Sequence, residues 1–190
     1  MPRRQHAGVS GRGDWRALLS AAVTRYSGYF AQLPLRGVTD SVDDRRTPPE
    51  LFARLDREFD FTLDAAASPD NALCERYFAL KDDGLVESWA GERVWCNPPY
   101  SFLPQWVAKA DSETEALVVM LVPANRTEQR WWQDIVEPQR DGRGRIETRF
   151  LRRRVHYVHP NRRSQGHAPY ASVLLIWRTD IANAGKPDQP

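Results

Sequence analysis

The chain of 190 residues lacks the features that define several common protein classes. With only Cys74 and Cys96 it has no disulfide framework and no Cys-x-x-Cys metal site, so a reducing cytoplasm is expected. Its four histidines do not have the spacing of a zinc site, and we predict no metal. No apolar run approaches the length of a membrane span, so no membrane partner is expected.

The chain also lacks a strong net charge, but the balance is uneven along it. There are 27 basic and 25 acidic residues, a net charge of +2. Residues 140–163, here called the arginine segment, hold nine arginines and two acidic residues, a local net charge of +7. The rest of the chain is therefore acidic by five charges. This asymmetry predicts a surface that faces a polyanion.

The hydrophobic pattern predicts one α/β domain over residues 46–180. Residues 1–45 are expected to form an extension with an accessory helix from Asp14 and a linker, and residues 181–190 a disordered tail. Thr47 is expected to cap a helix that runs to Phe59, with Glu50 completing a capping box. Further helices are expected at residues 70–78, 104–110 and 128–136, and strands at residues 60–64, 92–96, 116–122, 146–150 and 171–177.

Strands that alternate with helices predict a mostly parallel sheet with an antiparallel edge. The run from Ala116 to Val122 is the most apolar in the chain, as expected of a central strand buried on both faces. The distance from Asp64 to Asn97 leaves no room for two complete strand–helix units, because one such unit needs roughly 30 residues. The sheet is therefore expected to be abbreviated on that side.

Asn97-Pro98-Pro99-Tyr100 follows one of these strands and is the most informative motif. The two prolines prevent a helix interior or a central strand, so the motif forms a rigid loop. The Asn97 side-chain oxygen and the Pro98 carbonyl can together hold an exocyclic amine, while Tyr100 can stack on the ring that carries it. The alternative, a loop without function, is disfavoured because ligands bind outside the carboxyl ends of strands in such sheets.

The ordered motifs of the chain resemble those of the phage-type DNA N6-adenine methyltransferases, the small Dam-like enzymes of bacteriophages and prophages. The resemblance covers roughly residues 45–178 and includes Asn97–Tyr100. It departs from the family pattern at Arg46, Arg153 and Tyr157, where Trp, Gly and Phe are usual. The other blocks that carry it are Thr47-Pro48, Leu63-Asp64-Ala65-Ala66-Ala67-Ser68, Asn71-Ala72, Asp83-Gly84-Leu85, Trp89, Leu121-Val122-Pro123-Ala124, Trp131-Trp132, Phe150-Leu151-Arg152-Arg153-Arg154-Val155-His156-Tyr157 and Ala168-Pro169-Tyr170-Ala171-Ser172.

This resemblance implies a compact Rossmann-like methyltransferase fold and methyl transfer from S-adenosylmethionine to adenine N6 in DNA, in the cytoplasm of a bacterial host cell. Asn97, Pro98, Pro99 and Tyr100 would form the catalytic loop on a base flipped out of the duplex. The residues expected to bind the cofactor are Thr47, Pro48, Asp64, Ala65 and Asp83, although three alanines stand in place of a Gly-x-Gly loop. The candidate DNA contacts are Arg152, Arg153, Arg154, Arg162 and Arg163.

Two other functions fit the same residues. A methyltransferase of this design can act on cytosine N4 or on RNA, although cytosine enzymes more often carry Ser at the position of Asn97. A catalytically silent DNA-binding module would use the arginine segment without binding S-adenosylmethionine. The sequence does not determine the oligomeric state, and a monomer is compatible with it.

Overall fold

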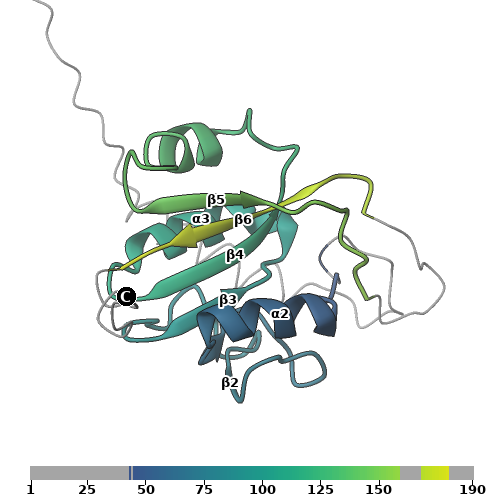
Figure 1. Cartoon of the computed structure of the whole chain (residues 1–190). Coiled ribbons are helices and arrows are strands. Elements are labelled where there is room, and N and C mark those ends of the chain that lie inside the picture. The colour runs from purple at the N-terminus through teal and green to yellow at the C-terminus, as the bar shows by residue number, and fades with distance from the viewer. Residues whose placement is uncertain (1–42, 44, 159–167, 180–190) are drawn as a thin grey trace, which may run out of the picture. The chain divides into compact units, whose positions relative to one another are not determined.

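The computed structural model describes residues 43, 45–158 and 168–179. The predicted accessory helix, the tail of residues 181–190, Arg162 and Arg163 lie outside these residues. The described residues form a six-stranded sheet with helices on both faces (Figure 1), which confirms the predicted α/β fold. Among them, no helix is long and apolar enough to cross a membrane, and no three His, Cys, Asp or Glu side chains are grouped to bind a metal ion.

The sheet has the strand order β2-β1-β3-β4-β6-β5. The first four strands in this order are mutually parallel, and β6 is antiparallel to both β4 and β5. The predicted mostly parallel sheet with an antiparallel edge is therefore confirmed. The strands are β1 (Leu63–Asp64), β2 (Arg76–Tyr77), β3 (Arg93–Cys96), β4 (Leu117–Pro123), β5 (Ile146–Phe150) and β6 (Ser172–Trp177).

The core lies on both faces of β4, whose seven residues are all buried. Val119 pairs with Trp95 on β3 and with Ile176 on β6, and these three residues belong to the cluster that packs under helix α2 (Pro49–Phe59). Because side chains alternate along a strand, Val118 points to the opposite face. The prediction of a central strand buried on both faces is confirmed.

The two helices that cover the sheet follow the predicted periodicity. Four apolar residues of α2 are buried, and each contributes about 1.5–3 kcal/mol by leaving water. Helix α3 (Leu103–Ser112) lies behind the sheet in Figure 1 and buries Trp106, Val107 and Ala110. It contacts the short π-helix η2 (Trp132–Val136), and the 3-10 turn η1 (Tyr100–Phe102) leads into it.

The predicted threonine cap of α2 is wrong. The N-cap is Pro48, in extended conformation at φ −61° and ψ 133°, and no side chain caps the helix. A cap at Thr47 would have required Pro48 to be helical, but the residue before a proline is driven away from helical angles by the ring of Pro49. The Pro48 carbonyl accepts the first helical hydrogen bonds, from the N–H groups of Leu51 and Phe52 at 3.0 and 3.1 Å.

The connection between β1 and β3 also differs from its prediction. Residues 70–78 form turns and the two-residue strand β2 instead of a helix. The Asn71 side chain accepts a hydrogen bond from the Ser68 N–H at 2.7 Å, which favours a turn over a helical start. With only this short strand between β1 and β3, the sheet is abbreviated on that side, as predicted.

Candidate active site

The carboxyl ends of the parallel strands share one edge of the sheet, here called the strand-end edge. β1 ends at Asp64, β3 ends directly before Asn97, and β4 ends at Pro123. Because β6 is antiparallel, its first residue Ser172 pairs with Pro123 at the same edge. Ligands of open α/β sheets bind outside the carboxyl ends of the strands, so this edge is the candidate active site.

The Asn97 amide is held by the backbone of the segment before α2. Its Nδ2 donates to the Arg45 carbonyl at 2.7 Å. This bond fixes which end of the amide faces Arg45, so the side-chain oxygen points elsewhere as an acceptor. The Pro99 carbonyl accepts the Phe102 N–H at 3.0 Å, whereas the Pro98 carbonyl has no backbone donor among the described residues. The loop therefore offers two acceptors, the Asn97 oxygen and the Pro98 carbonyl.

Tyr100 lies inside a cluster with Tyr157 and Tyr170, here called the tyrosine cluster. Its ring is only 5% exposed, and its hydroxyl lies 2.6 Å from the Tyr157 hydroxyl. The ring centroids are 6.4 Å apart for Tyr100–Tyr157 and 6.3 Å for Tyr100–Tyr170. Burial raises the pKa of Tyr100 well above its ordinary value, so the phenol stays neutral. The ring predicted to stack on a base is thus covered by the protein's own side chains.

Arg45 closes the tyrosine cluster and was not identified from the sequence. Its guanidinium lies 5.1 Å from the ring centroid of Tyr170 and 5.8 Å from that of Tyr157, and it bonds to the Tyr170 hydroxyl. Its Nε is buried without a partner among the described residues. Ser101 N–H donates to Asp43 at 2.9 Å, so the chain before α2 contacts both Asn97 and Ser101. No local pattern marks Arg45, which is 52 residues from Asn97.

Asp64 is a buried carboxylate at the end of β1. It is 3% exposed and accepts hydrogen bonds from the Leu73 N–H at 3.1 Å and the Ala66 N–H at 3.4 Å. Burial raises its pKa from 3.8 to about 6, and the two backbone donors offset only part of this effect. Ala65 is fully buried, and its N–H donates to the Trp95 carbonyl at 3.0 Å. The carboxylate oxygens of Asp64 can therefore accept further hydrogen bonds at the end of β1.

The structure brings the Asp83-Gly84 turn against Ala65. A Cβ on Gly84 would collide with the Ala65 carbonyl oxygen, so only glycine allows this approach. Asp83 has a left-handed conformation at φ 52°, and its carboxylate accepts the Leu85 N–H at 3.3 Å. Trp106 also touches the position of that Cβ, and its Nε1 is buried without a partner among the described residues. Trp106 was not among the site residues predicted from the sequence.

Thr47 and Pro48 lie directly before the first residue of α2. Thr47 is buried, and Pro48 is half-buried. The preceding Arg46 pairs with Val158 through two backbone hydrogen bonds of 3.0 Å, and its side chain reaches the Asp70 carbonyl at 3.4 Å. The chain before α2 thus runs between the loop that follows Asp64 and the segment that follows β5.

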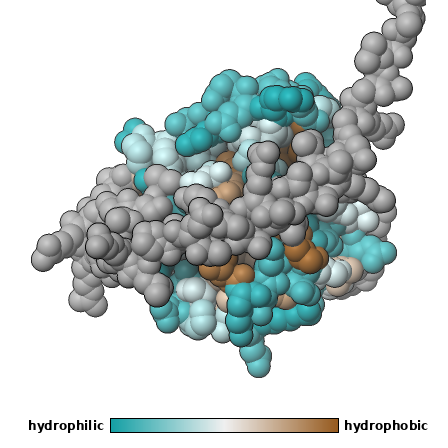
Figure 2. Space-filling model, turned by 180° about the vertical axis from the view of Figure 1, so that it is seen from behind, coloured by the Kyte–Doolittle hydropathy of each residue, from teal (hydrophilic) through white to brown (hydrophobic). Residues whose placement is uncertain are grey.

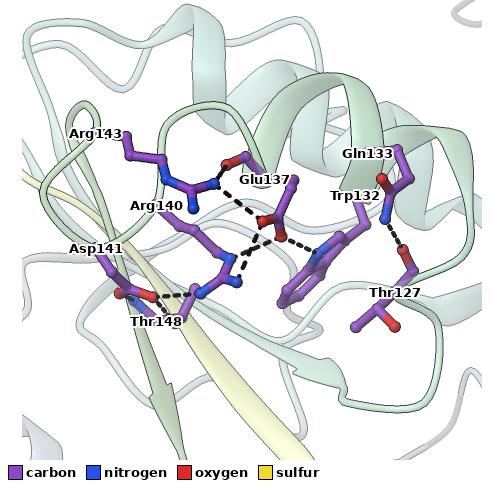
Figure 3. Close-up of polar contacts among 8 residues, drawn as sticks. All are labelled: Thr127, Trp132, Gln133, Glu137, Arg140, Asp141, Arg143 and Thr148. Carbon is purple, nitrogen blue, oxygen red and sulfur yellow. Dashed lines mark hydrogen bonds and ion pairs between the residues drawn. The ribbon is translucent and has the colours of Figure 1, made fainter.

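The arginine segment divides into two parts. Its first four arginines bond to carboxylates of the protein: Arg140 and Arg143 to Glu137, Arg145 to Asp111, and Arg149 to Glu58 and Glu147. Figure 3 shows Glu137 also accepting from the Trp132 indole at 3.2 Å. In contrast, residues 152–154 are exposed and form no ion pair within the described part of the chain. These three lie just beyond β5, at the strand-end edge.

Comparison with known proteins gives the family of the chain. The family model of DNA N-6-adenine-methyltransferase (Dam) matches residues 37–186. A DNA N-6-adenine-methyltransferase of Escherichia phage T1 is 36% identical over 124 residues, which cover 63% of this chain and 51% of the phage protein. The match thus spans about half the length of that relative. Because the family model covers more than half of the chain, the protein belongs to the DNA N-6-adenine-methyltransferase (Dam) family.

Proposed function

We propose that the protein transfers a methyl group from S-adenosylmethionine to N6 of adenine in DNA. Family membership supports the reaction class. The observation that carries the proposal to individual residues is the Asn97 amide, whose nitrogen is bonded to the Arg45 carbonyl while its oxygen is left to accept. An acceptor fixed in this way beside a second one, the Pro98 carbonyl, suits the two hydrogens of an exocyclic amine.

The residues around Asp64 fit the cofactor. S-adenosylmethionine carries hydroxyl and amino groups that donate hydrogen bonds, together with acceptors. Asp64 is a buried carboxylate that, among the described residues, accepts hydrogen bonds from two backbone N–H groups, so it can accept more from the cofactor. The Trp106 Nε1, buried without a partner among the described residues, is a donor beside the Ala65–Gly84 contact. Asp64, Ala65 and Asp83 would therefore hold the cofactor, with Thr47 and Pro48 at the entrance of α2. When bound, S-adenosylmethionine supplies a methyl group on a positively charged sulfur.

The catalytic loop acts on the amine. The N6 lone pair of adenine is delocalised into the ring, which makes the nitrogen a poor nucleophile. The Asn97 side-chain oxygen and the Pro98 carbonyl accept hydrogen bonds from its two N–H groups and draw the nitrogen toward tetrahedral geometry, so that the lone pair points at the methyl group. Pro99 keeps the loop rigid, and much of the remaining barrier is lowered by alignment. The amide and the carbonyl are not bases, so the proton released by the methylated amine passes to water.

Entry of the base requires a rearrangement at Arg45. Stacking of adenine on Tyr100 needs a ring that is now buried in the tyrosine cluster, where Arg45 lies over the rings of Tyr157 and Tyr170. Arg45 itself is half-buried and lies outside any helix or strand, so its side chain can swing away, whereas Tyr157 is buried and bonded to Tyr100. Asn97 therefore holds the amine, and Tyr100 supports the base after Arg45 has moved.

The test is nucleoside mass spectrometry of DNA incubated with the protein and S-adenosylmethionine. We expect N6-methyladenine from the wild-type protein and a loss of about 100-fold or more in rate for Asn97→Ala, because an acceptor used in the transition state is removed. Cofactor binding, measured by calorimetry, should persist in this variant. Gln133→Ala is the matched control, since Gln133 is an exposed amide that bonds to the Thr127 carbonyl (Figure 3).

Three outcomes would contradict the proposal. N4-methylcytosine in place of N6-methyladenine would identify a different target. DNA binding without cofactor binding would identify a silent DNA-binding module. Full activity of the Asn97→Ala variant would remove the assigned role of the loop.

A further inference from the structure

Phe150 is a large hydrophobic side chain that the fold leaves in water. It is the last residue of β5 and is 57% exposed. Most of the described surface in Figure 2 is hydrophilic, and its hydrophobic side chains gather in separate patches. Single exposed hydrophobic residues such as Leu80, 52% exposed, are ordinary on protein surfaces. Exposure alone therefore does not indicate a role for Phe150, and a role has to be inferred from its position in the fold.

Phe150 lies on the strand-end edge that carries the catalytic loop. It pairs with Val173 at the start of β6, and the next residue, Leu151, packs into the core and donates to the Ser172 carbonyl at 3.0 Å. Since side chains alternate along a strand, Phe150 points away from that core. β5 is three positions from β3 in the sheet, so Phe150 and Asn97 are roughly 14 Å apart along the edge.

The surroundings of Phe150 are cationic. Arg152, Arg153 and Arg154 follow within four residues, all exposed and without an ion pair within the described part of the chain. The sequence contains no acidic residue between Glu147 and Val158. An exposed aromatic ring beside several unpaired guanidinium groups matches nucleic acid, whose phosphates attract the cations and whose bases stack on the ring.

We propose that Phe150 inserts into the DNA duplex and fills the space left by the adenine that enters the site at Asn97. This inference rests on the proposed function, because a base inside the duplex cannot reach the catalytic loop. Extruding a base leaves a gap in the stack, and apolar side chains that enter a base step stabilise such distorted DNA. The separation of roughly 14 Å is comparable with the width of the major groove, about 12 Å. Arg152–Arg154 then hold the phosphates on either side of the gap.

The experiment compares Phe150→Ala with the wild-type protein on two duplexes that differ at one position. Both carry a site that the wild-type protein methylates. In one the target adenine is paired with thymine, and in the other it faces an abasic position. In a parallel pair, 2-aminopurine replaces the target adenine and reports its unstacking by fluorescence, which needs no methyl transfer. Leu80→Ala is the control, since it removes a similarly exposed apolar side chain far from β5.

Loss of the stacking side chain should slow methylation of the paired duplex by about 10- to 100-fold and remove most of the 2-aminopurine signal. On the abasic duplex, where extrusion costs less, the variant should come within about threefold of the wild-type rate. Phe150→Trp should retain activity on both, and Leu80→Ala should match the wild-type protein.

The inference is overturned if Phe150→Ala methylates the paired duplex as fast as the wild-type protein. It is also overturned if the variant is slowed equally on both duplexes, since that would indicate a role other than filling the gap. Failure of the proposed function looks different: the wild-type protein itself then makes no N6-methyladenine. In that case a wild-type 2-aminopurine signal that Phe150→Ala removes still supports insertion, and its absence excludes it.

Discussion

Two regions of the molecule differ in whether their charged side chains form ion pairs within the protein. In the turn between η2 and β5, each charged side chain has a partner of opposite sign, and Figure 3 shows the pairs of Arg140 and Arg143. Arg140 bonds to Glu137 at 2.7 Å and to Asp141 at 2.8 Å, and the bond from Arg140 lowers the pKa of Glu137. At the strand-end edge, Asp64 is buried with backbone donors as its described partners, and residues 152–154 are exposed and unpaired within the described chain.

This difference separates charges that serve the fold from charges that are left for a ligand. Ion pairs within the turn satisfy both partners, so they gain little from DNA or a cofactor. A buried carboxylate whose burial is only partly offset by hydrogen bonds destabilises the fold, and such groups are found most often where they are used. We therefore expect Asp64 and Arg152–Arg154 to take part in binding, and the four arginines from Arg140 to Arg149 to stabilise the fold.

The largest expected effect is on DNA affinity. Replacing Arg152, Arg153 and Arg154 together by Gln should weaken DNA binding roughly 100-fold at low salt, because three phosphate contacts are lost. The slope of log affinity against log salt concentration should fall by about 2 to 3. Fluorescence anisotropy with a labelled duplex over a series of salt concentrations measures both quantities.

The matched control replaces Arg140, Arg143 and Arg145 by Gln, which changes the net charge by the same amount. These side chains are bonded to Glu137, Asp141 and Asp111, so DNA affinity should fall much less while thermal stability falls more. Equal weakening of DNA binding by the two triple variants would mean that only the overall charge matters, and the comparison would fail.

The division of the arginine segment into paired and unpaired arginines could not be predicted from the sequence. Its net charge of +7 predicts a polyanion-facing surface, but four of its arginines are neutralised by the fold. Glu58 is 91 residues from Arg149, and Asp111 is 34 residues from Arg145. Pairing over such distances depends on how α2 and α3 pack on the sheet, which local charge counting does not capture.

Regular elements were predicted better than the contacts around the loop. Periodicity predicted α2, α3 and the four longer strands, since each buries a defined apolar face. The cap at Thr47 failed because the restriction that Pro49 places on Pro48 outweighs the capping preference. The position of Asn97–Tyr100 after β3 follows from the sequence, but the cover provided by Arg45 and the tyrosine cluster does not. These contacts join segments that share no local pattern.

A second test concerns the pH dependence of stability at Asp64. The folded state raises its pKa from 3.8 to about 6, so the folded protein binds this proton more tightly than the unfolded chain. The resulting stabilisation is complete below about pH 4 and is lost as the pH rises through about 6, a change of about 3 kcal/mol. Asp64→Asn removes this loss and should raise the free energy of unfolding near pH 7.5 by about 1–3 kcal/mol.

Urea unfolding of the wild-type protein and the Asp64→Asn variant near pH 4.5 and near pH 7.5 measures the difference. Calorimetry should show weaker S-adenosylmethionine binding by the same variant, the stability–function trade-off expected of a binding residue. Asp134→Asn is the control, since Asp134 is an exposed carboxylate paired with Arg130. A variant that is destabilised equally at both pH values would indicate that Asp64 is compensated in the fold and belongs with the paired charges.

The smallest effect is expected at Arg149. It belongs to the arginines that are paired within the fold, although it is only three residues from Arg152. Its guanidinium bonds to both oxygens of Glu58 at 2.7 and 2.9 Å and joins β5 to α2. Arg149→Gln should lower the free energy of unfolding by about 0.5–1 kcal/mol, less at high salt, because the pair is partly exposed. DNA affinity should stay within about twofold of the wild-type value. Arg153→Gln should give the reverse, with weaker DNA binding and unchanged unfolding. If instead Arg149→Gln weakened DNA binding as much as Arg153→Gln, Arg149 would have to be counted among the arginines that contact DNA.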